Sequence, residues 1–224
     1  MSDADWLVPA LAAHSDRLAR AYGVPRRLQR HDSVALTFDD GPHSEGTPAV
    51  LAELRRRGAR ATFFLVGEQV RRAPEVARAV ADEGHEIALH GDRHTLLLRR
   101  RVASFAADLD RAAESIAEAT GRAPVLYRPP YGVFSSGALR HVRSRGLEPW
   151  LWSSWGRDWE RRATPASIAR RVAARLGPGA VVLLHESDAY SSAGSWRRTA
   201  AALPSILDAA AALGVSVESV TQST

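Results

Sequence analysis

From residue 33 onward, short β-rich runs alternate with longer amphipathic segments, and this alternation constrains the fold more than any other feature. The runs that predict strands are 33–38, 62–66, 86–89, 125–127, 148–152, 181–184 and 215–218. Helical periodicity fills most of the intervals, at 48–57, 74–83, 102–119, 165–176 and 196–213. Repeated strand and helix in this order predicts a parallel sheet.

Polar residues stand at the carboxyl ends of four of these runs and indicate what kind of parallel sheet to expect. They are Asp39 with Asp40, His90, Arg128 and His185. A closed barrel brings all such ends to one mouth, whereas an open sheet gathers only those beside its switch point. The predicted fold class is therefore α/β, as a distorted (β/α) barrel of about seven parallel strands.

The chain is long enough for one domain with a sizeable core, at 224 residues of which 45% are hydrophobic. No interior stretch is rich enough in Gly, Ser or Pro to form a linker. We expect residues 31–224 to form the barrel domain. Residues 1–30 are expected to add an amphipathic N-terminal helix that packs on the outside of the barrel.

Charge and hydropathy argue against a nucleic-acid or membrane partner. The net charge is +5, but arginine runs such as 55–57 and 99–101 lie at helical positions among Glu and Asp, as in solvated, ion-paired helix faces. No stretch approaches the ~20 apolar residues of a membrane span. Asp3, Asp5 and His14 interrupt the pattern of a signal peptide, so a cytoplasmic location is expected. Nothing in the sequence indicates the oligomeric state.

All 30 basic residues are arginine and the chain has no cysteine, which removes several kinds of catalysis. A Schiff-base lysine, a phosphate-loop lysine, a thiol nucleophile and a disulfide are all impossible. No serine lies in a Gly-x-Ser-x-Gly elbow. An enzyme with this sequence has to use carboxylates, histidines, hydroxyls or a metal.

Two short motifs together predict a metal site. Asp39 and Asp40 lie in TFDDGP, and His90 and His94 lie four residues apart in HGDRH, so that one turn can point both rings the same way. Either motif alone is weak evidence, since spaced histidines often decorate surfaces and Asp-Gly-Pro favours turns. In combination they offer one carboxylate and two imidazoles to a metal, with a second carboxylate free for proton transfer, as metal-assisted hydrolysis requires.

Three further motifs follow in order, namely RPPYG at 128–132, GRDW at 156–159 and LLH at 183–185. With TFDDGP and HGDRH, they resemble the five motifs of the polysaccharide deacetylase family, which is carbohydrate esterase family 4 with its NodB homology domain. That family includes chitin, peptidoglycan and chitooligosaccharide deacetylases. The resemblance spans about residues 33–220 and leaves residues 1–30 outside.

The resemblance implies a metal centre and a general base. Asp40, His90 and His94 would bind one divalent ion, with Zn²⁺ as the first choice and Co²⁺ or Ni²⁺ as alternatives. Asp39 would be the base that takes a proton from the metal-bound water. Arg128 would pair with Asp39 and keep it ionised and oriented.

The resemblance also implies a general acid and substrate contacts. His185 would protonate the departing amine, with Asp158 favouring its imidazolium form. The backbone N–H of Tyr131 would help to stabilise the oxyanion. Trp159 and Leu183 would wall the pocket for the acetyl methyl group.

Three positions depart from the family pattern. Gly91 replaces the usual Ser or Thr, so a hydrogen bond that supports the metal ligands would be missing or come from solvent. Glu186 stands where Asp is commoner. Trp155 stands where the fourth motif often carries an acidic residue, and it is expected to reshape the substrate contacts.

Other aromatic residues and histidines give weaker signals. Trp150 and Trp152 are expected in the core, whereas Trp155 joins the pocket candidates because aromatic faces suit sugar rings. His43 and His85 are expected to be structural or exposed. The polar loop after the LLH motif is expected to form a rim of the pocket.

The leading hypothesis for function is metal-dependent removal of an N-acetyl group from an amino sugar or glycan, with release of acetate. One alternative is hydrolysis of another amide, such as a formamide or a cyclic amide. A second is a non-catalytic carbohydrate-binding barrel, and a third is arginine-mediated binding of nucleic acid. The substrate stays open between a polymer, a lipid-linked precursor and a small metabolite.

Overall fold

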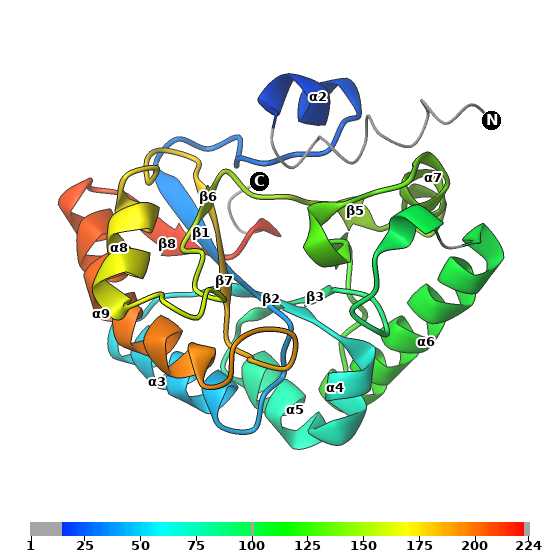
Figure 1. The fold of residues 1–224 in the computed structure, drawn as a ribbon, viewed down its shortest axis with the longest axis horizontal. Helices are drawn as coiled ribbons and strands as arrows, with labels where there is room; N and C mark the ends of the chain where they lie inside the picture. Colours follow the sequence, from blue (N-terminus) through cyan, green and yellow to red (C-terminus); the bar gives the residue numbers. More distant parts are fainter. Residues whose placement is uncertain (1–14, 100, 222–224) are drawn as a thin grey trace.

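The computed structural model describes residues 15–99 and 101–221, in which eight parallel strands curl into a distorted barrel (Figure 1). The strands are β1 (Ser33–Asp39), β2 (Thr62–Leu65), β3 (Glu86–Leu89), β4 (Leu126–Tyr127), β5 (Glu148–Pro149), β6 (Ser154–Trp155), β7 (Val181–His185) and β8 (Ser216–Glu218). Their order is β5-β4-β3-β2-β1-β7-β6, and β8 also pairs with β1. The predicted α/β class and parallel, distorted barrel are confirmed.

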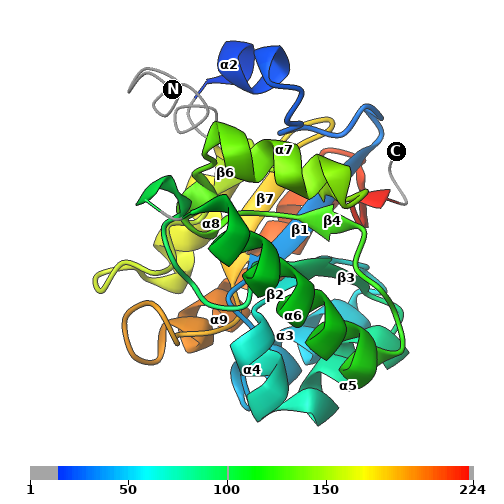
Figure 2. The same ribbon diagram turned by 90° about the vertical axis from the view of Figure 1, so that its right-hand side faces the viewer.

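Helices cover the outside of the sheet, because parallel neighbours need crossover connections. They are α2 (Asp16–Ala21), α3 (Gly46–Arg56), α4 (Gly67–Arg72), α5 (Pro74–Asp82), α6 (Val102–Thr120), α7 (Ser136–Ser144), α8 (Pro165–Ala173) and α9 (Ser195–Ala212), with single 3₁₀ turns η2 (Leu97–Arg99) and η3 (Pro130–Gly132). Figure 2 shows α6 and α7 across the side of the barrel that carries β3 and β4. Within the described residues, none of the helices is long and apolar enough to cross a membrane.

Local sequence explains where several helices begin and end. Helix α8 begins with a capping box, in which Thr164 Oγ1 accepts the Ser167 N–H at 3.1 Å and Ser167 Oγ accepts the Thr164 N–H at 2.9 Å. Its first residue is Pro165, and α5 likewise starts with Pro74, a position where the missing N–H costs nothing. Helix α6 ends at Gly121, whose φ of 71° suits a left-handed cap.

Strand β1 lies in the middle of the sheet, and all of its residues are buried. Successive side chains of a strand point to opposite faces. Thr37 and Asp39 therefore share the face that carries polar groups, whereas Phe38 points the other way and stacks on Phe63 with ring centroids 5.1 Å apart. A strand buried on both faces in this way is typical of parallel sheets covered by helices.

The barrel closes through the irregular segment between β5 and β6. Trp150 N–H donates to the Tyr127 carbonyl at the end of β4, and three residues later Ser153 N–H donates to the Val181 carbonyl of β7. The segment thus leaves one edge of the sheet and joins the other. The strand predicted over 148–152 is shorter than expected, because β5 ends at Pro149, where the chain begins to change its hydrogen-bond partner from β4 to β7.

The described part of the N-terminal segment contributes to this closure. Helix α2 is capped by Ser15 and followed by extended chain, in which the Pro25 carbonyl accepts the Leu151 N–H and the Leu28 N–H donates to the Gly179 carbonyl. Leu28 is part of the barrel core. Residues 1–14 of the predicted helical extension lie outside the described residues, and its boundary at residue 30 stays a prediction.

Two helices and one strand were not expected from the sequence. Helices α4 and α7 have six and nine residues, and each includes glycine in its first turn, which weakens the helical signal. Strand β6 has two residues, too few for any period. The remaining predicted helices and strands correspond to observed elements, with small shifts at their ends.

Candidate active site

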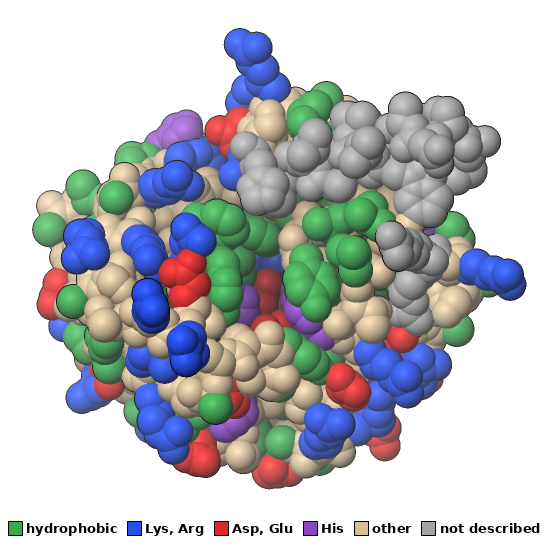
Figure 3. All heavy atoms as spheres, in the orientation of Figure 1, with side chains coloured by type: hydrophobic (Ala, Val, Ile, Leu, Met, Phe, Trp, Pro, Cys, Tyr) green, Lys and Arg blue, Asp and Glu red, His purple; other side chains and the backbone are tan. Residues whose placement is uncertain are grey.

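The carboxyl ends of four strands bring the ionic residues of the site together. Asp39 and His185 end β1 and β7 and lie opposite each other in the register of these neighbouring strands. His90 and Arg128 directly follow β3 and β4, which are also neighbours. In Figure 3 the resulting hollow opens on one face of the molecule, with histidine and acidic side chains at its bottom.

Asp40, His90 and His94 form a cluster whose ligand atoms all lie within 4.8 Å of one another. Asp40 Oδ1 is 3.5 Å from His90 Nε2 and 3.4 Å from His94 Nε2. His90 Nδ1 lies 2.8 Å from the carbonyl oxygen of Arg128, which can only accept, so Nδ1 carries the proton and the Nε2 lone pair faces Asp40. This orientation is the one a metal-binding imidazole needs.

The charges in this cluster also suit a cation. Asp40 Oδ1 is buried and accepts no hydrogen bond from any described residue. Burial alone would raise the pKa of Asp40, but His90, His185 and His94 outweigh it and lower the pKa to about 2. Burial lowers the pKa of His94 to about 4, so this ring is neutral at pH 7. A buried carboxylate oxygen that accepts no hydrogen bond and faces two imidazole nitrogens is a donor set that fits a divalent ion of the zinc type.

Two tyrosines hold the ring of His94. Tyr190 stacks on it with centroids 4.5 Å apart and planes 13° apart, and Tyr131 meets it edge-on at 4.5 Å. The Tyr190 hydroxyl donates to Glu68 Oε1 at 2.5 Å and accepts from Gln69 Nε2 at 3.0 Å. Tyr190 comes from the loop that was expected to form a rim, but no feature of its sequence distinguished this residue.

Asp39 is held by a fully buried arginine. Arg128 Nη1 donates to Asp39 Oδ1 at 2.7 Å and to Thr37 Oγ1 at 2.8 Å, while Nη2 donates to the Leu151 carbonyl at 3.2 Å. The guanidinium also lies 3.9 Å from the centre of the Phe64 ring. A buried arginine that donates to several oxygens at once fixes the orientation of the carboxylate.

His185 is paired with the buried carboxylate of Asp158. His185 Nδ1 lies 2.9 Å from Asp158 Oδ1, and Asp158 Oδ2 accepts the His185 backbone N–H and the Thr199 hydroxyl, each at 2.7 Å. Burial alone would lower the pKa of His185, but Asp158 and then Asp40 outweigh it and raise the pKa to about 10. The ring is therefore charged at neutral pH, with Nε2 4.0 Å from Asp40 Oδ2.

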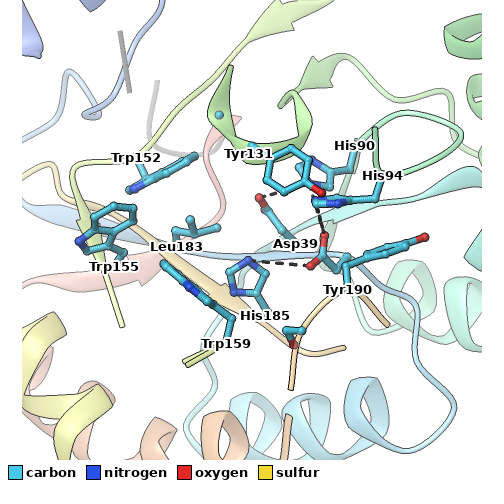
Figure 4. Close-up of a pocket in the computed structure, with 13 residues that line it drawn as sticks. Asp39, His90, His94, Tyr131, Trp152, Trp155, Trp159, Leu183, His185 and Tyr190 are labelled. Atoms are coloured by element: carbon cyan, nitrogen blue, oxygen red, sulfur yellow. Dashed lines mark ion pairs between the residues drawn. The ribbon is translucent and has the colours of Figure 1, made fainter. Parts of the chain in front are cut away.

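These groups line one cavity of about 250 Å³ (Figure 4). One wall is apolar and consists of Trp152, Trp155, Trp159 and Leu183. The two tyrosines lie on the opposite side, together with the cluster of Asp40, His90 and His94. Tyr131 is 59% exposed and has a φ of 61°, a left-handed conformation that is costly outside glycine. The Tyr131 side chain lies at the cavity.

The structure brings every predicted site residue to this cavity or directly behind it. Nine of them line it, namely Asp39, Asp40, His90, His94, Tyr131, Trp155, Trp159, Leu183 and His185. Arg128 and Asp158 lie behind Asp39 and His185 as their ion-pair partners. Trp150 and Trp152 are buried as expected, but Trp152 also lines the cavity, which the sequence did not indicate.

An ionic network around the buried carboxylate of Asp92 supports the loop that carries His90 and His94. Asp92 accepts from Arg71 at 2.6 Å and from Arg111 at 3.0 Å, and its own N–H donates to Asp108 at 3.3 Å. Gly91 has a φ of 91°, which favours glycine at this turn. Sequence reasoning looked for support from a hydroxyl at position 91 and missed this network, because its partners lie on α4 and α6.

Glu186 is a buried carboxyl group directly behind the site. Neither of its carboxyl oxygens has a hydrogen-bond partner among the described residues, and burial raises the pKa of Glu186 well above its usual value. Burial thus favours the protonated form of this side chain. It fills the space beside Gly41, where a Cβ atom would lie 1.8 Å from Glu186 Oε1, so a larger residue at position 41 would require the Glu186 side chain to move.

Comparison with known proteins agrees with this geometry. Residues 27–150 match the sequence profile described as polysaccharide deacetylase. The chain is 32% identical over 200 residues to a chitooligosaccharide deacetylase of Azorhizobium caulinodans, covering 86% of this chain and 95% of that protein. It is 32% identical over 163 residues to the peptidoglycan-N-acetylglucosamine deacetylase PgdA of Listeria monocytogenes, covering 73% of this chain but only 34% of that protein.

Solved structures show the same relationship. A peptidoglycan N-acetylglucosamine deacetylase superposes with a TM-score of 0.85 at 27% identity, covering 92% of this chain and 94% of that one. A family 4 carbohydrate esterase from Streptomyces lividans, in complex with acetate, superposes with a TM-score of 0.75 at 33% identity, covering 84% and 92%. The match in sequence, fold and order of motifs leads to one conclusion. This chain belongs to the polysaccharide deacetylase family.

Proposed function

We propose that the chain is a metal-dependent hydrolase that removes the N-acetyl group of an amino sugar or glycan and releases acetate. One observation carries the proposal. Asp40 Oδ1 is buried, accepts no hydrogen bond within the described residues and faces two imidazole nitrogens, and a second carboxylate and a charged histidine lie beside it. Amide hydrolysis needs an activated water, a charge sink and a proton donor, and these groups can supply all three.

The metal would be held by Asp40, His90 and His94. One carboxylate and two imidazoles suit zinc best, and cobalt or nickel accept the same ligands. A divalent ion bound there would lower the pKa of a water molecule and polarise the amide carbonyl. The relatives that carry deacetylase names support the assigned reaction.

Asp39 serves as the general base, and Arg128 positions it. The ion pair at 2.7 Å leaves Asp39 Oδ2 as the oxygen that faces the cluster, 3.7 Å from His90 Nε2. This oxygen can accept the proton of the attacking water without losing its arginine partner. The backbone N–H of Tyr131, a residue that lines the cavity, is the donor that we assign to the developing oxyanion.

His185 serves as the general acid that protonates the amine. An amine is a poor leaving group unless its nitrogen gains a proton as the bond breaks. The Asp158 carboxylate holds the ring through Nδ1, so Nε2 is the nitrogen turned toward the cavity. Overall, the hydroxyl of water joins the acyl carbon, the C–N bond breaks, and the nitrogen takes the proton.

The choice of the first substrate follows from the extent of the relatives. The chain spans nearly the whole of a chitooligosaccharide deacetylase but about a third of the Listeria peptidoglycan enzyme. We therefore assign short N-acetylglucosamine oligomers as the first substrate class to test. Small acetamido sugars and peptidoglycan fragments are the next.

The test is acetate release from these substrates by chelated protein and by the same protein reloaded with Zn²⁺ or Co²⁺. Acetate that appears only after reloading supports both the reaction and the metal requirement. Activity that survives chelation would contradict the metal role. No acetate from any substrate, with the metal content confirmed, would contradict N-deacetylation and leave hydrolysis of another amide or sugar binding.

A further inference from the structure

The two histidines that face Asp40 are held in different ways. His90 Nδ1 donates to the Arg128 carbonyl at 2.8 Å, which fixes the plane of the ring and leaves the Nε2 lone pair facing Asp40. His94 Nδ1 is buried and has no hydrogen-bond partner within the described residues. Histidines that bind metals almost always donate this second ring N–H to an acceptor, because the bond orients the ligand. His94 therefore needs another source of orientation.

Two aromatic rings contact the His94 ring and supply this orientation (Figure 4). Tyr190 stacks on His94 with ring centroids 4.5 Å apart and planes 13° apart, and Tyr131 meets it edge-on at 4.5 Å. Stacked and edge-on pairs are the favourable geometries of aromatic rings. Rings on two sides of His94 keep its plane in place, with Nε2 3.4 Å from Asp40 Oδ1.

Tyr190 is fixed at its far end by the first turn of α4. Its hydroxyl donates to Glu68 Oε1 at 2.5 Å and accepts from Gln69 Nε2 at 3.0 Å. Gln69 is 8% exposed, so this end of the ring is enclosed. Tyr131 differs, because its side chain is largely exposed. Tyr190 is therefore the better fixed of the two rings that contact His94.

The same turn of α4 also holds the loop that carries His94. Gly67 N–H donates to the Gly91 carbonyl, and Glu68 N–H donates to the Asp92 carbonyl, each at 2.9 Å. One short helix thus sets the position of the histidine loop and of the tyrosine that stacks on the histidine. Because both partners of the stack are held by one regular element, their relative position is preorganised.

The stacked tyrosine lies in residues 187–194, here called the rim loop, and this loop is held by other segments as well. Near its start, Asp188 Oδ1 lies 3.2 Å from His43 Nε2. Near its end, Ser192 Oγ donates to the Trp159 carbonyl at 3.1 Å. A loop that is braced in this way gives up little further freedom when a ligand binds beside it.

We propose that Tyr190 is a positioning residue of the metal site, and this inference rests on the proposed function because it takes His94 as a ligand. The stacked ring holds His94 in the orientation that a hydrogen bond on Nδ1 gives to His90. Glu68 and Gln69 act through Tyr190, since they fix its hydroxyl. The metal affinity of the chain therefore depends on a residue of the rim loop that is not itself a ligand.

The first test compares the zinc affinities of the full chain and its variants, measured by competition with a chromophoric chelator. Tyr190→Leu removes the aromatic ring, and we expect zinc to bind about 10- to 100-fold more weakly, as after other losses of support behind a metal ligand. Tyr190→Phe keeps the ring and loses the hydroxyl, so its affinity should lie within about fivefold of that of the unmodified protein. Zinc affinity that is unchanged in Tyr190→Leu, or equally weak in both variants, would overturn the inference.

Tyr22→Leu is the matched control, with the same substitution at a tyrosine that follows α2 and packs against the barrel core away from the cavity. Its zinc affinity should be unchanged. The visible absorption of the cobalt-loaded proteins reports ligand geometry, which a general loss of stability does not alter. The Co²⁺ bands should change in Tyr190→Leu and return in Tyr190→Phe. Identical bands in Tyr190→Leu and the unmodified protein would show that His94 keeps its place without the stack.

Glu68→Ala tests the inference independently of how well Tyr190→Leu folds. This variant removes the acceptor of the tyrosine hydroxyl and leaves both stacked rings in the chain. We expect zinc to bind about three- to tenfold more weakly, as the loss of one hydrogen bond implies. Combining Glu68→Ala with Tyr190→Leu should weaken binding no further than Tyr190→Leu alone, because Glu68 acts through Tyr190. Additive losses in the double variant would contradict that route.

Zinc affinity is measured without substrate, so this inference and the proposed function can fail separately. Zinc binding that weakens in Tyr190→Leu supports the inference even if the unmodified protein releases no acetate, a result that would contradict the proposed function. Full zinc affinity in Tyr190→Leu and in Glu68→Ala, together with metal-dependent release of acetate, overturns the inference and leaves the proposed function intact. An unmodified protein that binds no zinc, cobalt or nickel contradicts both.

Discussion

Two buried histidines flank the same strand, and the two ends of that strand give them different surroundings. His85 directly precedes β3 and is 1% exposed, and His90 directly follows it and is 2% exposed. His85 Nδ1 accepts the Ala61 N–H at 3.3 Å, and its Nε2 has no hydrogen bond within the described part of the chain. His90 Nε2 instead faces Asp40 at 3.5 Å and Asp39 at 3.7 Å.

The surroundings of His85 and His90 differ because different residues meet at the two ends of the barrel. At the carboxyl ends of the strands, polar residues from four strands meet, so that an imidazole finds carboxylates and a defined tautomer. At the amino end, His85 packs against the Phe63 ring at 5.4 Å with no carboxylate on its ring nitrogens. Burial of a histidine is therefore a poor indicator of a functional site, whereas the presence of neighbouring carboxylates is a good one.

Removing a carboxylate from the carboxyl end should have the largest effect, because it makes the surroundings of His90 more like those of His85. Asp40→Ala is expected to abolish metal binding and to lower kcat/KM about 1,000-fold or more, as the loss of several kcal/mol of charge stabilisation implies. Metal content by elemental analysis and acetate release measure the two effects.

Asp32→Ala is the matched control for this experiment. Asp32 directly precedes β1, at the opposite end of the strand that Asp40 follows, and forms an exposed ion pair with Arg30 at 2.7 Å. Metal content and activity should be unchanged in this variant, because exposed ion pairs contribute little. Full metal content in the Asp40→Ala protein would show that the ligand assignment is wrong.

The second largest effect should separate the two adjacent aspartates. Asp39→Asn keeps the shape of the side chain and removes its basicity, so we expect kcat to fall by about 100- to 10,000-fold. Metal content should stay at one ion per chain, since Asp39 is held by Arg128 and not needed as a ligand. Activity close to that of the unmodified protein would contradict the role of the base.

The ionic half of the site was predictable because each of its residues follows a strand in a short, dense motif. We could place Asp39, Asp40, His90 and His185 together on the single assumption that the carboxyl ends of parallel strands meet at one mouth of the barrel. The aromatic half was predictable only in part. Trp152 reaches the cavity from an irregular segment whose hydrogen-bond partner changes from β4 to β7. No periodic pattern of hydrophobic residues in the sequence indicates such a change.

Contacts between distant segments account for the rest of what the sequence did not indicate. Tyr190 is placed by Glu68 and Gln69, more than 120 residues earlier, and the loop is also tied down by His43, which lies 3.2 Å from Asp188. In the fold, longer strands and helices followed from their periods. The short elements α4, α7 and β6 depend on tertiary packing, which overrides weak local preference.

A third prediction concerns His185, because its ring is paired with the Asp158 carboxylate, whereas the ring nitrogens of His85 meet no carboxylate. Asp158→Asn removes the charge that raises the pKa of His185 while keeping the hydrogen-bonding shape. The alkaline limb of kcat should move to lower pH, because the protonated acid is then lost sooner, and kcat at pH 8 should fall about 100-fold. An unmoved alkaline limb in a pH–rate profile would assign that limb to another group.

The smallest effect is expected at the amino end, where His85 should matter for stability and leave catalysis untouched. Burial, reinforced by Arg60, lowers the pKa of His85 to about 4, whereas an unfolded histidine has a pKa of ~6.5. The unfolded chain therefore binds more protons between these values. The stability that depends on a neutral His85 is complete above pH 6.5 and is lost as the pH falls toward 4, by about 3 kcal/mol in all.

A residue that does not titrate should remove this dependence. In His85→Asn the side-chain oxygen can accept the Ala61 N–H, so the protein should still fold, with a free energy of unfolding about 1–2 kcal/mol lower at pH 8. Denaturant unfolding from pH 8 to pH 4 should show the unmodified protein losing about 3 kcal/mol more than the variant. The exposed His31→Asn protein should follow the unmodified curve. If His85→Asn also runs parallel to that curve, His85 does not carry the acid sensitivity, and the two ends of β3 differ less than their surroundings suggest.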